Sequence, residues 1–413
     1  MSLHARESVI SEPTSIDPGS QHAAVIAFIA EHLGRTLVTS SLTVIEPTDT
    51  GYLHGYDLKL RAPDGTIENQ QVFIDDSPHG NQRGVISVPI PGSSTPAAVW
   101  IYPGDPELPA LREVVEPISA SLILERLGAP ATVRSISVVT YRPGRRAVVR
   151  VEAESARYYL KVVEPTKAAS IAERHQQFRS SSLPVPRLLG WSSDGIIVMS
   201  ELPGVDAQSC VARMQDPEGF LDQVEFMSAL LANVPAFNTA RASLVDRLDW
   251  YIERVCLRLP GEAARVRDVG GMIARCSADG RSYGYTAVTI HGDLHLGQLF
   301  VDPENTGQIT GMLDIDTAGT GDPADDAAAF YAHLVALGET AFALDPAFAA
   351  ACDRLAAAWR SRWQRNRNAG FANRASAIAA THLLGHALRP LSTDSEAVSL
   401  RLLDRAQGLV RDW

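Results

Sequence analysis

Residues 291–316 read HGDLHLGQLFVDPENTGQITGMLDID and place acid–base and metal-binding side chains between apolar runs. Asp293 follows a short apolar strand, Gln298 comes five residues later, and Asp314 ends the apolar run QITGML. A carboxylate that orients a hydroxyl group, with an amide and a second carboxylate that hold a hard cation, suffices for metal-assisted phosphoryl transfer. The segment therefore predicts a metal site, an acid–base site, or both, on loops between short strands.

The composition limits the class of protein. The chain has 413 residues, of which 45% are hydrophobic and 21% charged, as in ordinary globular proteins. Its net charge of −11 argues against a nucleic-acid partner, because such proteins carry a basic face. The four cysteines are scattered, which indicates reduced thiols in a cytoplasmic protein. No apolar run is long enough to span a membrane, and the first residues do not resemble a signal peptide.

The pattern of residues divides the chain into four parts. Residues 1–20, rich in Ser, Pro and acidic residues, predict a disordered tail. Residues 21–112 begin with a helix that ends at Gly34 and continue as β-rich pieces with turns such as the Asp-Gly hairpin of RAPDGTI, which predicts an α+β cap subdomain. Residues 113–205 predict an α+β N-lobe, entered through one helix over 111–128. Residues 206–413 predict a helical C-lobe.

Apolar residues recur every three or four positions throughout the C-lobe. This spacing predicts helices at 220–234, 243–259, 324–338, 347–364, 376–388 and 395–410. The short strands AVTI, QLFV and QITGMLDI interrupt the helical pattern and carry the polar residues of the opening segment. A β-rich lobe, a helical lobe and polar loops near their junction predict an enzyme with a cleft.

The segments HGDLHLGQLF (291–300) and GMLDIDTAGTGDPADDAA (311–328) resemble the aminoglycoside phosphotransferase and choline kinase superfamily. The Gln-containing form is most similar to maltokinase-type sugar kinases, which carry an additional N-terminal cap domain. The resemblance implies an α+β, protein-kinase-like two-lobed fold, with a β-rich N-lobe, a helical C-lobe and a cap. It implies Asp293 as the catalytic base and Gln298 and Asp314 as Mg²⁺ ligands. The commoner family residue at position 298 is Asn.

The same resemblance implies a nucleotide site in the N-lobe. Lys161, in the strand RYYLKVV, stands where such kinases keep the lysine that pairs with the ATP phosphates, and Glu173 stands where they keep the Glu that orients it. Backbone groups from Ser200 to Leu202 would contact adenine. The hairpin TYRPGRRAVV would cover the phosphates with Gly144 in its turn, in place of a glycine-rich loop, and Arg145 or Arg146 is a weaker candidate for phosphate contact.

Other polar residues near the motif have plainer interpretations. His291 is interpreted as a structural residue that holds the turn by hydrogen bonds. Asp326 resembles the buried aspartate with which the family braces the catalytic loop. For His295 the alternatives are a contact with substrate and a packed position, and for Asp316 they are assistance to the metal and plain solvation.

Two pairs of side chains at helical spacing are interpreted as packed faces. Trp359 and Trp363 lie four residues apart, which favours core packing over sugar stacking. His382 and His386 have the same spacing, at which two histidines can chelate zinc. No acidic residue accompanies them as in the HExxH motif, so a packed face is preferred.

Three functions compete at this stage. The leading hypothesis is a kinase that uses ATP and Mg²⁺ to phosphorylate a small-molecule hydroxyl, the acceptor being a sugar, an amino sugar or an aminoglycoside. The second is a metal-dependent hydrolase with His291, Asp293 and His295 as ligands. The third is a non-catalytic binding protein on a kinase-like scaffold, suggested by the missing glycine-rich loop. The presence of both Asp293 and Asp314 argues against the third.

Overall fold

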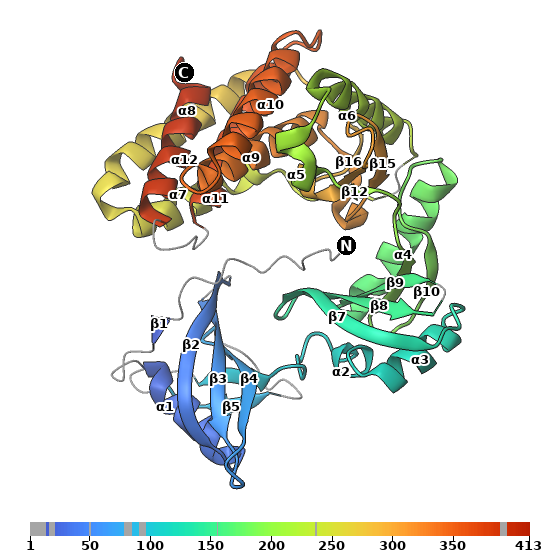
Figure 1. Ribbon diagram of the computed structural model, residues 1–413. Helices are drawn as coiled ribbons and strands as arrows, with labels where there is room; N and C mark the ends of the chain where they lie inside the picture. The colour runs from blue at the N-terminus through green and yellow to red at the C-terminus, as the bar shows by residue number, and fades with distance from the viewer. Residues whose placement is uncertain are drawn as a thin grey trace. The chain divides into compact units, whose positions relative to one another are not determined.

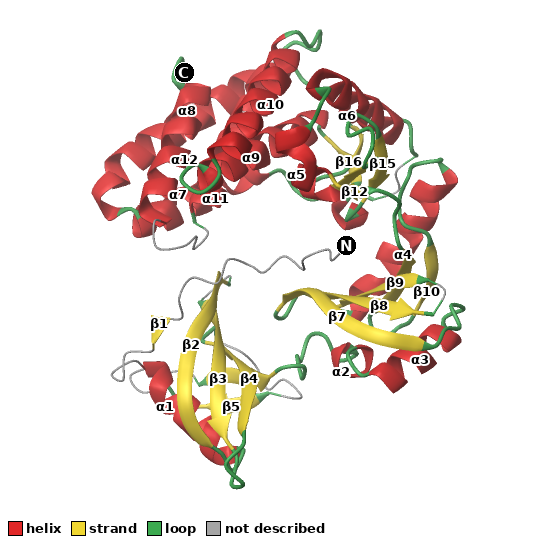
Figure 2. Cartoon of the chain, in the orientation of Figure 1, coloured by secondary structure: helices red, strands yellow, loops and turns green. Residues whose placement is uncertain are grey.

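The computed structural model describes residues 14–15, 21–48, 51–77, 85–90, 96–154, 156–235, 238–388 and 395–413 (Figures 1 and 2). These residues divide into two compact units. The first runs to Ala172 and includes Leu188–Ser200, and the second comprises Glu173–Arg187 and Glu201–Trp413. The first unit is rich in strands and the second is mainly helical (Figure 2).

An antiparallel sheet, here called the cap sheet, opens the first unit. Its strand order is β1-β2-β3-β4-β6-β5. The strands are β1 (Thr14–Ser15), β2 (Thr36–Pro47), β3 (Tyr52–Arg61), β4 (Ile67–Asp75), β5 (Ile86–Val88) and β6 (Ala97–Ile101). Helix α1 (Gln21–His32) packs on this sheet, because Val25, Ile26 and Ile29 share a buried cluster with apolar side chains of β3, β4 and β6.

Two local predictions in the cap are confirmed. Helix α1 is followed by Gly34 in the left-handed conformation, with φ of +65°, which ends the helix as glycine usually does. The Asp-Gly turn joins β3 to β4, with Gly65 at φ of +88° and Asp64 Oδ1 accepting the N–H of Thr66 at 3.0 Å. The predicted tail lies outside the described residues except for Thr14–Ser15, which pair with β2.

A second antiparallel sheet completes the first unit, with strand order β10-β11-β9-β8-β7. Its strands are β7 (Val133–Arg142), β8 (Arg146–Ala153), β9 (Arg157–Val163), β10 (Leu188–Trp191) and β11 (Ile196–Ser200). Helix α4 (Pro165–Ser180) follows β9 along the chain. The predicted hairpin that contains TYRPGRRAVV is confirmed as the β7–β8 pair.

The single helix predicted over residues 111–128 is wrong, because the chain forms two helices there. They are α2 (Leu111–Val114) and α3 (Pro117–Arg126). Pro117 has no N–H to continue the first helix. Glu116 instead caps the second, its carboxylate accepting the N–H groups of Ile118 at 3.1 Å and Ser119 at 2.6 Å.

The second unit is built on helices packed around α9. The helices are α5 (Ala207–Cys210), α6 (Pro217–Ala232), α7 (Leu248–Arg258), α8 (Ala263–Ser282), α9 (Pro323–Ala341), α10 (Pro346–Gln364), α11 (Phe371–Ala387) and α12 (Ser395–Val410). Short 3-10 turns are Val211–Arg213, Leu244–Arg247, Pro260–Glu262, Leu296–Gln298 and Ile315–Thr317. The six helices predicted for the C-lobe are confirmed as α6, α7, α9, α10, α11 and α12.

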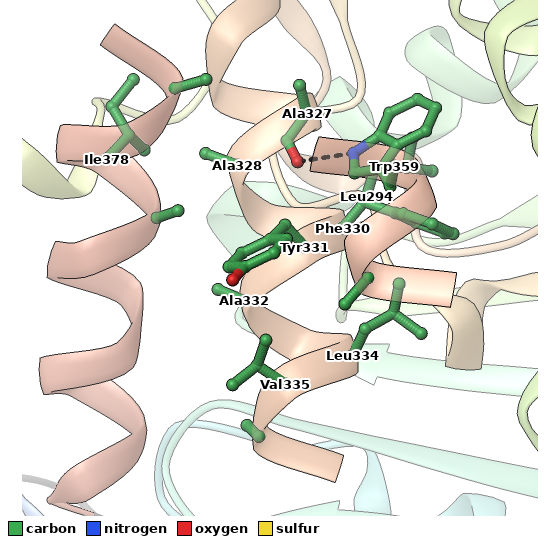
Figure 3. Close-up of a cluster of buried hydrophobic side chains, with 14 of the residues drawn as sticks. Leu294, Ala327, Ala328, Phe330, Tyr331, Ala332, Leu334, Val335, Trp359 and Ile378 are labelled. Carbon is green, nitrogen blue, oxygen red and sulfur yellow. Dashed lines mark hydrogen bonds between the residues drawn. The ribbon is translucent and has the colours of Figure 1, made fainter. Parts of the chain in front are cut away.

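Figure 3 shows the side of α9 that packs against α10, where Phe330 and Trp359 lie together. The indole N–H of Trp359 donates to the carbonyl of Ala327 at 2.9 Å. Trp359 and Trp363 are both buried, which confirms that this pair belongs to the core.

Helix α8 has no counterpart in the sequence predictions. Its sequence contains Gly270, Gly271 and Gly280, which lower helix propensity and interrupt the apolar spacing. The glycines have a packing role in the folded chain. A Cβ on Gly270 would lie 2.2 Å from Cδ1 of Ile252 in α7, so a larger residue here would force the Ile252 side chain to move.

Five short strands of the second unit form the framework of the polar segment. Strands β12 (Val205–Asp206), β14 (Leu299–Val301) and β15 (Ile309–Met312) form one small sheet, and β13 (Val288–Ile290) pairs with β16 (Gly319–Gly321). The predicted strands AVTI, QLFV and QITGMLDI are therefore confirmed in β13, β14 and β15. No helix in the part of the chain that the structure describes is long and apolar enough to cross a membrane.

Candidate active site

The loop after β13 is fixed by a buried carboxylate in the first turn of α9. Asp326 accepts the backbone N–H of His291 through Oδ2 and that of Gly292 through Oδ1, both at 2.7 Å. Burial raises the pKa of Asp326, while the His291 charge and the two N–H donors lower it. Thr317 Oγ1 donates to the carbonyl of His291 at 3.0 Å. The buried aspartate that the sequence was expected to place under this loop therefore holds the backbone of His291 and Gly292.

His291 itself is a structural residue, as the sequence suggested. Its side chain is fully buried, and Nε2 lies 2.8 Å from the carbonyl oxygen of Leu313. This hydrogen bond ties the start of the loop to the end of β15. His295, two residues beyond Asp293, receives the N–H of Gly297 on Nδ1 at 3.2 Å and stacks on His333 with ring centroids 4.2 Å apart.

Asp293 lies at the exposed end of this loop between two cationic or potentially cationic side chains. Its Oδ1 is 3.4 Å from Nη1 of Arg241 and 4.0 Å from Nε2 of His333. About a quarter of the Asp293 side chain is accessible, at 27%. A partly accessible carboxylate on a rigid loop can orient and deprotonate a hydroxyl group that binds next to it.

Gln298 and Asp314 are joined by the pairing of β14 with β15. The N–H of Leu313 donates to the carbonyl of Gln298 at 2.7 Å. Asp314 is the residue after Leu313, so this hydrogen bond brings the backbone of the two candidate ligands together. Asp314 has φ of +60° and ψ of +40°, a left-handed conformation that is uncommon outside glycine. Such outliers persist where the surrounding structure holds them, often at functional sites.

The side chain of Gln298 fits the expected role as a metal ligand. It is buried, with 5% exposed, and its Oε1 has no hydrogen-bond partner among the residues that the structure describes. A buried carbonyl oxygen without a partner costs free energy unless a ligand satisfies it. Amide and carboxylate oxygens are the ligands that Mg²⁺ prefers. The donor set of Gln298 and Asp314 therefore fits Mg²⁺.

The ligand set of the hydrolase hypothesis has less support. Within the ranges that the structure describes, one group of three His, Cys, Asp or Glu side chains brings its ligand atoms together, and it is His333, His382 and His386. His291, Asp293 and His295 do not form such a group. The hydrogen bond of His291 Nε2 to Leu313 also engages one ring nitrogen in holding the loop.

The residues expected to bind the nucleotide divide between the two units. Lys161 lies in β9 with register partners Val148 in β8 and Ile197 in β11, and its side chain is 4% exposed. Ser200 is the last residue of β11, and Leu202 is a buried residue of the second unit. Glu173 is an exposed residue of α4, also in the second unit. Its pairing with Lys161 stays a prediction.

Gly144 forms the turn of the β7–β8 hairpin, with φ of +68°. Its N–H donates to Asp105 Oδ2 at 2.7 Å, and the hydroxyl of Tyr141 donates to the same oxygen at 2.8 Å. Burial raises the pKa of Asp105. The turn is therefore anchored by a buried carboxylate from the segment that follows the cap sheet.

The arginines of this hairpin contact the cap. Arg142 Nη2 and Arg145 Nε lie 3.4 Å and 3.8 Å from Oε2 of Glu46 in β2. In the same region Phe73 and Trp100 of the cap sheet pack against Tyr141, with the Phe73 and Tyr141 ring centroids 5.4 Å apart. Arg145, a weak candidate for phosphate contact, is thus paired with a cap carboxylate.

Sequence reasoning missed two residues beside Asp293. Arg241 belongs to an irregular loop with no motif, and His333 lies in α9 without a spacing that links it to the catalytic loop. Arg174 was also missed, and its Nη1 donates to the carbonyl of Asp316 at 2.5 Å. These contacts join distant segments, and no local sequence pattern encodes them.

A cavity of about 190 Å³ lies beside Arg241 in the second unit. Charged residues in its wall are largely paired. Arg374 Nε donates to Asp322 at 2.6 Å, and Ser243 donates to Asp325 at 2.6 Å. Burial raises the pKa of Asp325 to about 7, with smaller contributions from the neighbouring carboxylates. The cavity therefore presents few uncompensated negative charges near neutral pH.

Comparison with known families now identifies the chain. The model of the phosphotransferase enzyme family, APH, matches residues 138–362, which is more than half of the sequence. The chain belongs to this family. As an APH phosphotransferase it is a small-molecule kinase with a kinase-like fold, in which a β-sheet N-lobe precedes a helical C-lobe. The predicted fold class is confirmed, and the cap sheet lies outside the matched residues.

A solved phosphotransferase structure shares this fold, and two others are similar to the chain at lower scores. A mutant of aminoglycoside 2′-phosphotransferase-IIIa in complex with GDP has a TM-score of 0.50 and 16% identity, covering 71% of this chain and 98% of its own. A thermostable mutant of aminoglycoside phosphotransferase APH(4)-Ia has a TM-score of 0.45 and 15% identity, covering 70% of this chain and 97% of its own. Macrolide 2′-phosphotransferase type I has a TM-score of 0.42 and 19% identity, covering 69% of this chain and 96% of its own. No curated protein matches the sequence.

Proposed function

We propose that this phosphotransferase moves the γ-phosphoryl group of ATP to a hydroxyl group of a small molecule. The observation that supports this most directly is the arrangement around Asp293. Its carboxylate is partly accessible on a loop that Asp326 holds by two hydrogen bonds, and the same loop leads to the buried, unpartnered Oε1 of Gln298. A base next to a site for a hard cation is what phosphoryl transfer needs.

In the proposed reaction Asp293 accepts the proton of the acceptor hydroxyl. The acceptor oxygen forms a bond to the γ-phosphorus as the bond from that phosphorus to the bridging oxygen of ADP breaks. The products are the phosphorylated acceptor and ADP, and the proton leaves from Asp293 to solvent. Arg241, 3.4 Å from the Asp293 carboxylate, would hold it in position for the incoming hydroxyl.

Gln298 and Asp314 would hold Mg²⁺, whose chemistry in such a site is to neutralise phosphate charge. Lys161 would contact the phosphates, and Glu173 would orient Lys161. Backbone groups from Ser200 to Leu202 would bind adenine, and the Gly144 turn would cover the phosphates. The motif residues support these assignments by resemblance, and the burial of Lys161 supports a charged partner for it.

For the acceptor we propose a neutral sugar before an aminoglycoside. Arg241 and His333 lie on the two sides of Asp293, and a cationic acceptor would bring further positive charge next to Arg241. The acids of the nearby cavity, Asp322 and Asp325, are paired with Arg374 or hydrogen-bonded and buried. This preference agrees with the resemblance of the Gln-containing motif to maltokinase-type sugar kinases.

The test is a transfer assay on the full-length chain with ATP labelled at the γ-phosphate, with Mg²⁺ and a panel of sugars, amino sugars and aminoglycosides. GTP is run in parallel. We expect labelled product from at least one neutral sugar. Labelled inorganic phosphate alone, from phosphate esters and without an acceptor, would favour the hydrolase hypothesis instead.

The variant Asp293→Asn assigns the base. It should lower transfer by at least about 100-fold while nucleotide binding is retained, because general-base catalysis contributes factors of this size. The matched control is Asp302→Asn, the same substitution on an aspartate that caps the turn after β14. Transfer that survives Asp293→Asn at the wild-type rate would show that another group is the base.

A further inference from the structure

Three histidines from two helices converge in the second unit. His382 and His386 lie one turn apart on α11, and His333 lies on α9. One ring nitrogen of each can be chosen so that all three lie within 4.8 Å of one another. His382 and His386 also lie beyond the residues that the phosphotransferase family matches.

Two of the three histidines are buried and the third is partly exposed. His382 and His386 are 6% and 7% exposed, whereas the side chain of His333 is 15% exposed. The ring of His333 meets that of His386 edge-on, with centroids 4.5 Å apart, and its opposite neighbour is the stacked ring of His295. Ring contacts on both sides thus hold His333 in place, and His333 is the one partly exposed member of the cluster.

We propose that His333, His382 and His386 bind a Zn²⁺ ion. Imidazole is a preferred ligand for this ion, and three histidines with one open position for water form a recurrent site. In a tetrahedral site with Zn–N bonds of about 2.0–2.1 Å the nitrogens lie about 3.3 Å apart. The three ring nitrogens lie within 4.8 Å of one another, and binding of the ion would bring them to this spacing. Two histidines at i and i+4 on one helix already form half of the site.

The site adjoins the proposed catalytic base. Nε2 of His333 is 4.0 Å from Oδ1 of Asp293. A divalent cation bound by His333 would therefore lie close to the carboxylate and attract it away from the acceptor hydroxyl. Zinc would act as an inhibitor of the kinase. This consequence rests on the proposed function, whereas binding of the ion does not.

The first experiment measures binding without nucleotide or acceptor. Full-length protein freed of metal by a chelator is titrated with ZnCl₂ in a calorimeter, and with CoCl₂ while the visible spectrum is recorded. We expect one ion per chain, and for Co²⁺ the intense absorption of a four-coordinate site with nitrogen ligands. Absence of stoichiometric binding, or an octahedral Co²⁺ spectrum, would overturn the proposal on the wild-type protein alone.

The second experiment assigns the ligands. His333→Gln, His382→Gln and His386→Gln should each weaken Zn²⁺ binding by at least about 10-fold, because each removes a ligand. The control is His32→Gln, which removes an exposed histidine of α1 and should leave the affinity unchanged. Thermal unfolding of each metal-free variant shows whether it is folded. Only the wild type and the control should gain thermal stability from zinc.

Two results would contradict the assignment. One is unchanged zinc affinity in the folded double variant His382→Gln/His386→Gln. The other is wild-type protein that binds no zinc while the variants raise the acceptor KM, because the histidines would then contact the acceptor. Failure of the transfer assay on every acceptor would refute the kinase proposal and leave the zinc measurement unaffected.

Discussion

The guanidinium group of Arg241 lies 3.4 Å from the carboxylate of Asp293. Arg241 comes from the loop before the 3-10 turn Leu244–Arg247, and its own N–H donates to the carbonyl of Thr317 at 3.0 Å. Thr317 in turn donates to His291 at the base of the catalytic loop. Arg241 therefore links the carboxylate of the proposed base to Thr317, which is itself bonded to the start of the same loop. Such an arrangement is expected of a residue that positions Asp293.

Arg241→Gln should lower kcat/KM for the acceptor by about 10-fold, equivalent to about 1.4 kcal/mol of transition-state stabilisation. The KM for ATP should not change, because Arg241 contacts the base. Arg241→Lys should restore part of the activity, since it keeps the charge and loses the planar fork. Arg267→Gln, at an exposed position of α8, serves as the control. Steady-state kinetics with each substrate varied decides the outcome, and wild-type kinetics in Arg241→Gln would exclude a positioning role.

Gln298→Met should separate stability from function. The substitution keeps an unbranched side chain of similar size and removes a buried carbonyl oxygen that has no partner in the described part of the chain. The metal-free protein should gain about 1 kcal/mol in free energy of unfolding, because an unsatisfied buried acceptor is costly. Transfer should fall by about 10- to 100-fold through loss of a metal ligand. Urea unfolding and the transfer assay measure the two effects.

The control for this variant is Gln308→Met, the same exchange at an exposed position before β15, which should change neither quantity appreciably. A loss of stability in Gln298→Met would contradict the first expectation and mean that the amide group stabilises the fold. A full rate of transfer would remove Gln298 from the metal site.

Asp325 should make the stability of the protein depend on pH. Burial raises the pKa of this carboxyl group to about 7, from an ordinary value of 3.8. Between these values the folded state binds a proton that the unfolded state does not. The free energy of unfolding therefore falls as pH rises, by up to about 4 kcal/mol at about 1.4 kcal/mol per pH unit. The stabilisation from this group is complete below pH 3.8, falls as pH rises between 3.8 and 7, and is lost above about pH 7.

Asp325→Asn tests this dependence, because the amide resembles the protonated acid and keeps an oxygen to accept the hydroxyl of Ser243. The variant should have a clearly higher Tm than the wild type at pH 8, a smaller advantage at pH 5, and nearly the same Tm below about pH 3.8, where the wild-type carboxyl is protonated in both states. Asp246→Asn, which changes an exposed acid of the same cavity wall, controls for the loss of a charge. Equal Tm values for Asp325→Asn and wild type at both pH values would contradict the raised pKa.

The local part of the candidate site has a clear signal in the sequence. Asp293, Gln298 and Asp314 lie within one short segment, where the alternation of apolar strands and polar loops fixes their order. The break between α2 and α3 also had a local signal, in Glu116 and Pro117, which the apolar spacing on both sides obscured.

The rest of the site depends on contacts between distant segments. The spacing of His382 and His386 shows that they share one face of α11, but it does not tell which helix packs on that face. The third histidine, His333, can be assigned to the cluster only from the packing of α9 against α11. Arg241 is missed for the same reason. Helix α8 is stabilised by close packing through Gly270, and glycine in a sequence lowers the expectation of a helix.

The cap sheet and the hairpin that would cover the ATP phosphates meet at Asp105. Its Oδ2 accepts both the Gly144 N–H and the Tyr141 hydroxyl, while Tyr141 packs against Phe73 of the cap. A Cβ on Gly144 would meet no other atom within 4 Å in the described part of the chain, and the contact that this turn makes with Asp105 is the hydrogen bond of its N–H. The conformation of the turn is therefore controlled from the cap side of the first unit.

Asp105→Ala should raise the KM for ATP by about 10-fold and leave the KM for the acceptor unchanged. The reason is that the released turn must be ordered again when ATP binds. A tenfold change corresponds to about 1.4 kcal/mol, which is close to the low end for a hydrogen bond to a charged group. Asp64→Ala removes a comparable turn aspartate between β3 and β4 and should leave both KM values unchanged. Circular dichroism confirms that each variant is folded. Equal ATP affinity in Asp105→Ala and wild type would mean that the Gly144 turn does not cover the phosphates.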